Sequence, residues 1–287
     1  MSLVTSKGML IDAKERNYAV GAFNANNIEM AQGIIKAAEE KKSPVIVQVS
    51  QGGAKYAGIE ELGAAIKKMA AKSEVPVALH LDHGVDYKYS VLALRAGYTS
   101  IMFDGSLLDF EENVKITKKI VEMGHIAGVP VEAELGEVPK DPEKISLDEL
   151  DKYKTKPEEA QKFAERTKVD SLAVAVGSMH KMKVQEAELD IEQIKKIKKR
   201  VSVPLVLHGS SGVTNKSVIE AINAGICKVN VHTHIAKSFT ERTREVLEKN
   251  SNMVDLRKYL KEGREALYEE VKNKIQIFGS EGMAAKL

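Results

Sequence analysis

The chain has little of what marks secreted, membrane-bound or polyanion-binding proteins. Its single cysteine, Cys227, allows no disulfide framework and favours a reducing compartment. Cys227 begins an apolar run, so we expect a small buried side chain there rather than a nucleophile. No apolar run approaches the ~20 residues that span a bilayer, and the first residues lack the apolar core of a signal peptide. We therefore expect a cytoplasmic protein with no membrane partner.

The chain also lacks a charge excess of either sign. Its 287 residues include 43 lysines and arginines against 41 aspartates and glutamates, for a net charge of +2. This balance gives no basis for a nucleic-acid partner. With 43% hydrophobic and 29% charged residues, and no internal repeat or linker, the chain is expected to form one α/β domain over residues 1–287.

Apolar runs of strand length alternate with segments of helical periodicity almost throughout the chain. The runs predicted as strands are 18–24, 44–49, 75–84, 99–103, 129–135, 169–180, 203–208 and 228–231. A further stretch, 255–278, predicts one or two extra helices. Eight βα units predict an α/β fold, a (β/α)8 TIM barrel with extra C-terminal helices.

Three of these runs end in histidine. One ends in Asp82 and His83, and two others end in His180 and His208. The carboxyl ends of barrel strands meet at one mouth, where the active sites of this fold lie. Imidazole is the commonest metal ligand, and three protein ligands with one open position describe a catalytic zinc site. A single histidine is more often a core or loop residue, but three at matching positions predict a shared metal.

Two other predicted strands have carboxylates at or near their ends. Asp104 follows the fourth strand and Glu134 lies near the end of the fifth. Either they surround a divalent ion as additional carboxylates or they cap the turns that follow, and both alternatives stay open. Lys228 lies at the start of its strand, the wrong end for Schiff-base chemistry, and neither a serine nucleophile elbow nor a Cys/His pair is present.

The loops after strands seven and eight are built from small and polar residues. They read His208-Gly-Ser-Ser-Gly212 and Asn230-Val-His-Thr-His234, and the second one opens a helix. In barrels these two loops frequently hold a phosphate. Small residues let backbone N–H groups approach the anion, and the helix dipole adds favourable charge. Gly-Ser-Ser-Gly alone also fits a plain turn, but its position after strand seven favours a phosphate.

Taken together, the motifs resemble those of the class II, metal-dependent ketose-bisphosphate aldolases, which include fructose-1,6-bisphosphate and tagatose-1,6-bisphosphate aldolases. The resemblance covers nearly the whole chain. It is carried by Phe23-Asn-Ala-Asn-Asn27, Gln48-Val-Ser-Gln-Gly52, Lys55-Tyr-Ala-Gly58, Leu79-His-Leu-Asp-His-Gly84, Asp104-Gly-Ser106, Val131-Glu-Ala-Glu-Leu-Gly136, His208-Gly-Ser-Ser-Gly212 and Lys228-Val-Asn-Val231. Leu-Asp-His-Gly and Val-Glu-Ala-Glu-Leu-Gly are specific in combination.

The resemblance implies a metal site and its occupant. His83, His180 and His208 would hold Zn²⁺, with Glu134 and Asp104 near an alternative metal position. Another divalent ion could replace Zn²⁺, and a monovalent cation could assist. A homodimer or a higher homo-oligomer is also implied.

The resemblance also implies a general acid and a substrate site. Asp82 would protonate the aldehyde-derived oxygen in condensation and remove that proton in cleavage. Zn²⁺ would stabilise, as a Lewis acid, the charge that develops when the C3–C4 bond of a ketose breaks. The residues implied in substrate binding are Ser50, Lys181, Gly209, Ser210, Ser211, Asn230, Val231, His232 and Thr233.

Two stretches depart from the family pattern. Relatives usually have His-Gly-x-Tyr-Lys at the second histidine, where this chain has His180-Lys-Met-Lys183. Relatives usually carry Gly-Gly-x-Glu-Asp in the loop after the fifth strand, which supplies an acid for proton transfer. This chain has Glu-Val-Pro-Lys-Asp-Pro-Glu there, so Glu137, Asp141 and Glu143 are the candidate replacements.

We therefore expect a zinc-dependent lyase of carbohydrate metabolism, as in glycolysis. It would reversibly cleave a ketose bisphosphate, by default fructose 1,6-bisphosphate, to dihydroxyacetone phosphate and an aldehyde such as glyceraldehyde 3-phosphate. Tagatose 1,6-bisphosphate, a phosphorylated deoxyketo-acid or another phosphorylated ketose is the alternative substrate. The competing classes are a non-catalytic metal- or sugar-phosphate-binding barrel and a metal-dependent hydrolase on the same fold.

Overall fold

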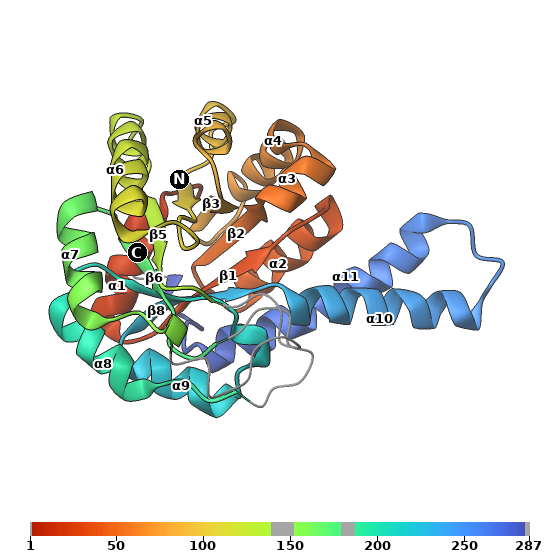
Figure 1. Ribbon diagram of the computed structural model, residues 1–287. Helices are drawn as coiled ribbons and strands as arrows, with labels where there is room; N and C mark the ends of the chain where they lie inside the picture. Colours follow the sequence, from red (N-terminus) through yellow and green to blue (C-terminus); the bar gives the residue numbers. More distant parts are fainter. Residues whose placement is uncertain (1, 139–151, 179–186, 285–287) are drawn as a thin grey trace.

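A computed structural model describes residues 2–138, 152–178 and 187–284. Within these ranges the strands form a closed parallel barrel in the order β1 to β8, and β8 pairs with β1 (Figure 1). The strands are β1 Val20–Asn24, β2 Val45–Ser50, β3 Val77–Gly84, β4 Ser100–Phe103, β5 Val131–Leu135, β6 Ser171–Val174, β7 Leu205–Leu207 and β8 Ile226–Val231. The predicted (β/α)8 barrel is confirmed.

Helix α1 precedes the first strand, and the other helices follow strands and lie on the outside of the barrel (Figure 1). They are α1 Ser6–Arg16, α2 Ile28–Glu40, α3 Gln51–Ala57, α4 Ile59–Ala70, α5 Tyr87–Arg95, α6 Phe110–Ile126, α7 Pro157–Thr167, α8 Ile191–Arg200, α9 Asn215–Ala224, α10 Thr233–Lys249 and α11 Leu256–Ile277, with a short 3-10 turn η2 at Ser210–Gly212. No helix within the described ranges combines the length and the apolar character needed to cross a membrane.

Side chains along each strand alternate between the barrel interior and the surrounding helices. On β2, Val45 and Val47 pack in the main hydrophobic core between barrel and helices. Ile46 faces the other way and packs in a second cluster with Met9 and Leu10 of α1. Helix α1 therefore covers the amino-terminal end of the barrel with apolar side chains.

Further toward the carboxyl ends, the barrel interior is polar. The same alternation that points Ile46 into the barrel also points the next set of buried side chains inward. This layer contains Gln48, His80, Glu132, Ser171 and Lys228. The next layer, also buried, contains Asn24, Asp82, Glu134, His208 and Asn230. Buried polar groups usually have hydrogen-bond partners, and the two layers contact one another: Gln48 donates to Asn24 Oδ1, and Glu132 Oε1 lies 3.0 Å from His208 Nε2.

Polar caps determine where several helices begin. The Asn27 side chain accepts a hydrogen bond from the Met30 backbone and caps the start of α2. Asp86 caps α5 in the same way. These caps fix the loops that leave the mouth of the barrel.

The structure differs from the sequence expectation in two helices and in the length of one strand. Helices α1 and α3 were not predicted. Strand β6 ends at Val174, so it is shorter than the apolar run that led to His180. The C-terminal stretch forms a single helix, α11, in agreement with the prediction of one or two helices there. It runs beside α10, and the two project together from the barrel (Figure 1).

Candidate active site

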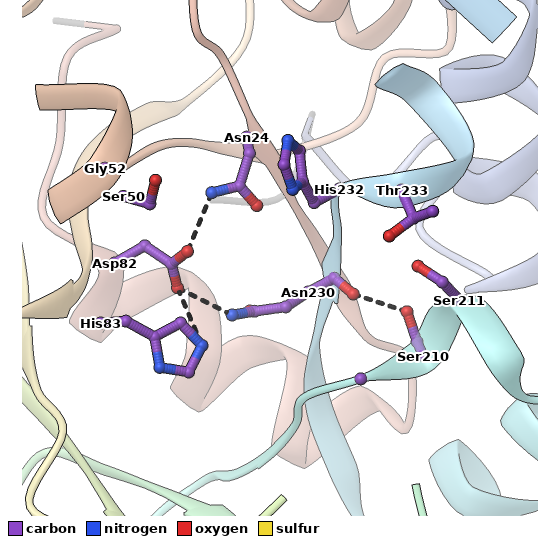
Figure 2. A pocket seen from close by; sticks show the side chains of 11 residues that line it. Asn24, Ser50, Gly52, Asp82, His83, Ser210, Ser211, Asn230, His232 and Thr233 are labelled. Atoms are coloured by element: carbon purple, nitrogen blue, oxygen red, sulfur yellow. Dashed lines mark hydrogen bonds and ion pairs between the residues drawn. The ribbon is translucent and has the colours of Figure 1, made fainter. Parts of the chain in front are cut away.

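A cavity of about 420 Å³ lies at the carboxyl ends of the strands, on the face predicted for a site. Figure 2 shows the side chains that line it. They are Asn24, Ser50, Gly52, Asp82, His83, Gly209, Ser210, Ser211, Asn230, His232 and Thr233. Most of the predicted substrate-binding residues are therefore brought together. His180 and Lys181 lie outside the described residues, and Val231 is buried in the hydrophobic core instead of lining the cavity.

Asp82 is held between two asparagines. Asn24 donates to Asp82 Oδ2 at 2.8 Å, and Asn230 donates to Asp82 Oδ1 at 3.1 Å (Figure 2). Burial raises the pKa of the Asp82 carboxyl, but the charges of His83, His208 and Lys228 outweigh it and lower the pKa. Asp82 is therefore a fixed carboxylate at neutral pH, able to accept a proton.

His83 faces the same cavity as its neighbour Asp82. Successive strand residues normally point to opposite sides. His83 departs from that alternation because its φ is +47°, at a point where the pairing of β3 with β4 shifts register between Leu81 and Gly84. Its Nδ1 lies 2.8 Å from Asp104 Oδ2, and its Nε2 lies 3.9 Å from Asp82 Oδ1. A carboxylate thus orients one ring nitrogen and the other faces Asp82.

His208 is oriented in the same manner. Its Nε2 lies 3.0 Å from Glu132 Oε1, and its Nδ1 lies 3.3 Å from Glu134 Oε2. The rings of His208 and His83 meet edge to face with centroids 4.7 Å apart. Burial lowers the pKa of His208, but the bonds to Glu132 and Glu134 outweigh it and raise the pKa to about 10. The cluster therefore favours a positive charge between the two rings.

These donors fit a divalent metal ion. Ligand atoms of Asp82, His83 and His208 lie within 4.8 Å of one another, as do those of His83, Asp104 and Glu134. Metal-ligating histidines typically donate their second ring N–H to a carboxylate, as both histidines are placed to do here. A bound metal cation would supply the positive charge that a proton on the imidazole rings supplies in the metal-free protein. Because the two groups share His83, they describe two adjacent positions for an ion.

The opposite side of the cavity is formed by small and polar residues from two loops. Gly209 has a φ of +65°, which a glycine adopts without strain and which turns the chain into η2 directly after His208. Ser210 and Ser211 follow it, and Thr233 is the first residue of α10, whose start has no side-chain cap. The start of α10 therefore lies beside the serines (Figure 2), and helix starts bind phosphate in other proteins.

Sequence reasoning overlooked several residues of this region. Asn24 and Gly52 line the cavity, and Glu132 and Lys228 lie directly behind His208. The alternation of side chains along a strand could have identified the last two. It points Glu132 into the barrel together with Glu134, and Lys228 together with Asn230. Asp104 and Glu134 contact His83 instead of only capping turns.

The fold and the site define a (β/α)8 barrel enzyme whose histidine and carboxylate groups are arranged for a metal at the strand ends. Residues 4–283 match the family described as Fructose-bisphosphate aldolase class-II. The chain belongs to this family and is therefore an aldolase, a carbon–carbon lyase. The predicted family and reaction class are both confirmed.

Known proteins resemble this chain over nearly its full length. A fructose-bisphosphate aldolase from Thermus caldophilus is 43% identical over 305 residues, 98% of this chain and 100% of the relative. A sulfofructosephosphate aldolase from Alkalicoccus urumqiensis is 41% identical over 284 residues, 99% of each. The crystal structure of the YdjI aldolase from Escherichia coli K12 matches with a TM-score of 0.85 and 38% identity, over 98% of this chain and 99% of that one.

Proposed function

We propose that this aldolase depends on zinc and reversibly cleaves a ketose 1,6-bisphosphate, with fructose 1,6-bisphosphate as the default substrate. The products would be dihydroxyacetone phosphate and glyceraldehyde 3-phosphate. The observation that carries the proposal is the pair of imidazoles of His83 and His208. Their ring centroids lie 4.7 Å apart, beside the Asp82 carboxylate. His180 is the proposed third ligand.

Asp82 is the proposed base in the cleavage direction. It would accept the proton of the C4 hydroxyl while the C3–C4 bond breaks and the aldehyde forms, and it would return that proton in condensation. Asn24 and Asn230 fix both carboxylate oxygens, so the proton-accepting atom is oriented before the substrate arrives. A bound divalent ion would act as a Lewis acid toward the substrate oxygens.

The serine-rich side of the cavity would hold the phosphate nearest the ketone. Gly209 and Ser211 come from the loop after β7, while His232 and Thr233 come from the start of α10. Both loops meet at the cavity, and Asn230 lies between them and Asp82. Its backbone carbonyl accepts a hydrogen bond from Ser210 Oγ, and its side chain donates one to Asp82 (Figure 2). The substrate would therefore extend from the serines to Asp82.

Metal dependence is tested by titrating activity against metal. The protein is stripped with a chelator and assayed for triose phosphate release as Zn²⁺ is added back. We expect activity to vanish on stripping and to return with about one equivalent of Zn²⁺ per chain. Full turnover by protein shown to be metal-free would contradict the zinc mechanism.

The substrate is tested with a panel of phosphorylated ketoses. Fructose 1,6-bisphosphate, tagatose 1,6-bisphosphate and sulfofructose phosphate are compared by kcat/KM. The last is included because a relative named for it is 41% identical over 99% of this chain. If tagatose 1,6-bisphosphate or sulfofructose phosphate has a higher kcat/KM than fructose 1,6-bisphosphate, that compound is the preferred substrate instead. Zinc binding with no cleavage would point to a non-catalytic barrel, and release of inorganic phosphate would point to a hydrolase.

A further inference from the structure

A chain of buried polar contacts runs from the cavity into the barrel. His208 Nε2 lies 3.0 Å from Glu132 Oε1, and the other oxygen of Glu132 lies 2.8 Å from Lys228 Nζ. Lys228 Nζ also lies 3.5 Å from His80 Nε2. The lysine side chain is 0% exposed and the glutamate 2%, so neither is solvated. Lys228 and Glu132 form an ion pair inside the barrel, one layer behind the cavity.

Such an ion pair is costly to bury, because each charge loses its hydration. Apolar side chains of similar volume would fill the same space, as they do one layer further toward α1. The pair is therefore not required to fill the barrel. What distinguishes it is its third partner, since Glu132 uses its second oxygen to contact the ring of His208.

The geometry of His208 determines what that contact does. An ionised carboxylate only accepts hydrogen bonds, so Nε2 must carry the ring proton toward Glu132. The lone pair of a neutral ring is then on Nδ1, the nitrogen that faces Glu134 and the ring of His83. Lys228 supplies the counter-charge that keeps Glu132 an acceptor.

On the basis of the proposed zinc site, we infer that Glu132 and Lys228 are positioning residues for the metal. Glu132 fixes the tautomer and the orientation of His208, and Lys228 fixes Glu132. Neither residue touches the substrate cavity. Their contribution is to present Nδ1 of His208 in a form that binds a cation without rearrangement.

The test measures zinc affinity by competition with a chromophoric chelator, and thermal stability in parallel. Glu132→Gln keeps an acceptor for His208 but removes its charge, and we expect zinc to bind about 10- to 100-fold more weakly. Lys228→Met should weaken zinc binding in the same direction. Each single variant should also lower the melting temperature, because it leaves the other member of the pair buried without a counter-charge.

The double variant, Glu132→Gln with Lys228→Met, separates positioning from charge balance. It leaves no unpaired charge, so stability should recover toward that of the unsubstituted protein while zinc affinity stays reduced. If zinc affinity recovers together with stability, the pair serves charge balance alone and the inference is overturned.

Asp170→Asn is the matched control, since it makes the same carboxylate-to-amide change directly before the start of β6, where Asp170 pairs with the exposed side chains of Lys7 and His125. It should lower stability and leave zinc affinity unchanged. Nitrogen chemical shifts of the His208 ring add a direct readout, because they report which nitrogen carries the proton. In zinc-loaded protein the expected signal is a ring with a proton on Nε2 alone, and a ring with its proton on Nδ1 would overturn the inference.

The outcomes also separate this inference from the proposed function. Unsubstituted protein that binds zinc but cleaves no ketose phosphate would remove the proposed function and leave the positioning role in place. Protein that binds zinc and cleaves, with the Glu132→Gln variant binding zinc equally well, would remove the positioning role alone. Failure of the unsubstituted protein to bind zinc would remove both.

Discussion

Asp82 and His83 are neighbours in the chain, yet their side chains converge, with His83 Nε2 3.9 Å from Asp82 Oδ1. A regular strand would send them to opposite faces. The left-handed backbone of His83 turns its ring back toward the cavity, where Asp104 holds it. The strand end thus places an imidazole and a carboxylate side by side, from consecutive residues.

Asp82→Asn tests the proposed base. The amide cannot accept the C4 hydroxyl proton, although it fills the same space between the asparagines. We expect kcat for cleavage to fall about 100- to 10,000-fold at saturating zinc, and zinc affinity is measured in parallel because Asp82 lies among the possible ligand atoms. Steady-state kinetics with metal analysis checks this, and a kcat within a few fold of the original would exclude Asp82 as the base.

Asn24→Ala tests the orientation of Asp82. The change removes the 2.8 Å hydrogen bond to Asp82 Oδ2 and frees the carboxylate to rotate. We expect kcat to fall on the order of 100-fold, the effect of a misplaced catalytic group, with zinc affinity unchanged. Asn27→Ala is the control, because Asn27 caps α2 outside the cavity. Equal losses of kcat in both variants would show that the effect is not specific to Asp82.

Leu10→Ala tests the role of α1 at the amino-terminal end of the barrel. Leu10 is 2% exposed and packs against the inward-facing apolar cluster. Its truncation should lower the free energy of unfolding by about 2–5 kcal/mol, measured by urea denaturation. Ile11, the next residue, is 41% exposed, so Ile11→Ala should cost within about 0.5 kcal/mol. Similar costs at the two positions would contradict the packing of α1 described above.

Asp170 should make stability depend on pH. Burial raises the pKa of this carboxyl, but the Val131 N–H, His125 and Lys7 outweigh it and lower the pKa below its ordinary value. A carboxyl whose pKa is lower in the folded state stabilises the protein fully above its unfolded pKa of about 3.9, and this contribution is lost as the pH falls through the folded pKa.

Asp170→Asn should therefore lower the free energy of unfolding by about 2 kcal/mol at pH 7, the value of hydrogen bonds to a charged group. The difference between the two proteins should narrow below pH ~4, where the unsubstituted carboxyl is itself protonated. Urea denaturation of both proteins across this range provides the comparison. A difference that stays constant from neutral to acid pH would show that the charge of Asp170 is not what stabilises the fold.

The sequence predicted much of the fold because the strands are continuous apolar runs and the helices after them have polar caps. It did not predict α1, which buries only a narrow stripe of Ser6, Met9, Leu10 and Ala13 against the barrel end. It also did not predict α3, whose Gly52 and Gly53 disfavour a helix that the Ser50 side chain nonetheless caps.

Within the site, the strand-end positions of Asp82, His83 and His208 were readable because each interrupts an apolar run. The distances between them were not readable, because they depend on barrel closure and on the φ of a single residue, His83. The pairing of Lys228 with Glu132 was missed because it joins opposite strands across the interior. The alternation along each strand gave both residues an inward direction but no partner.

The most direct test of the account is anomalous diffraction from zinc-loaded crystals at the zinc absorption edge. The account predicts a peak within about 2.0–2.1 Å of a ring nitrogen of both His83 and His208, next to the Asp82 carboxylate. A zinc peak bound elsewhere, or a cavity that stays empty in protein saturated with zinc, would contradict it.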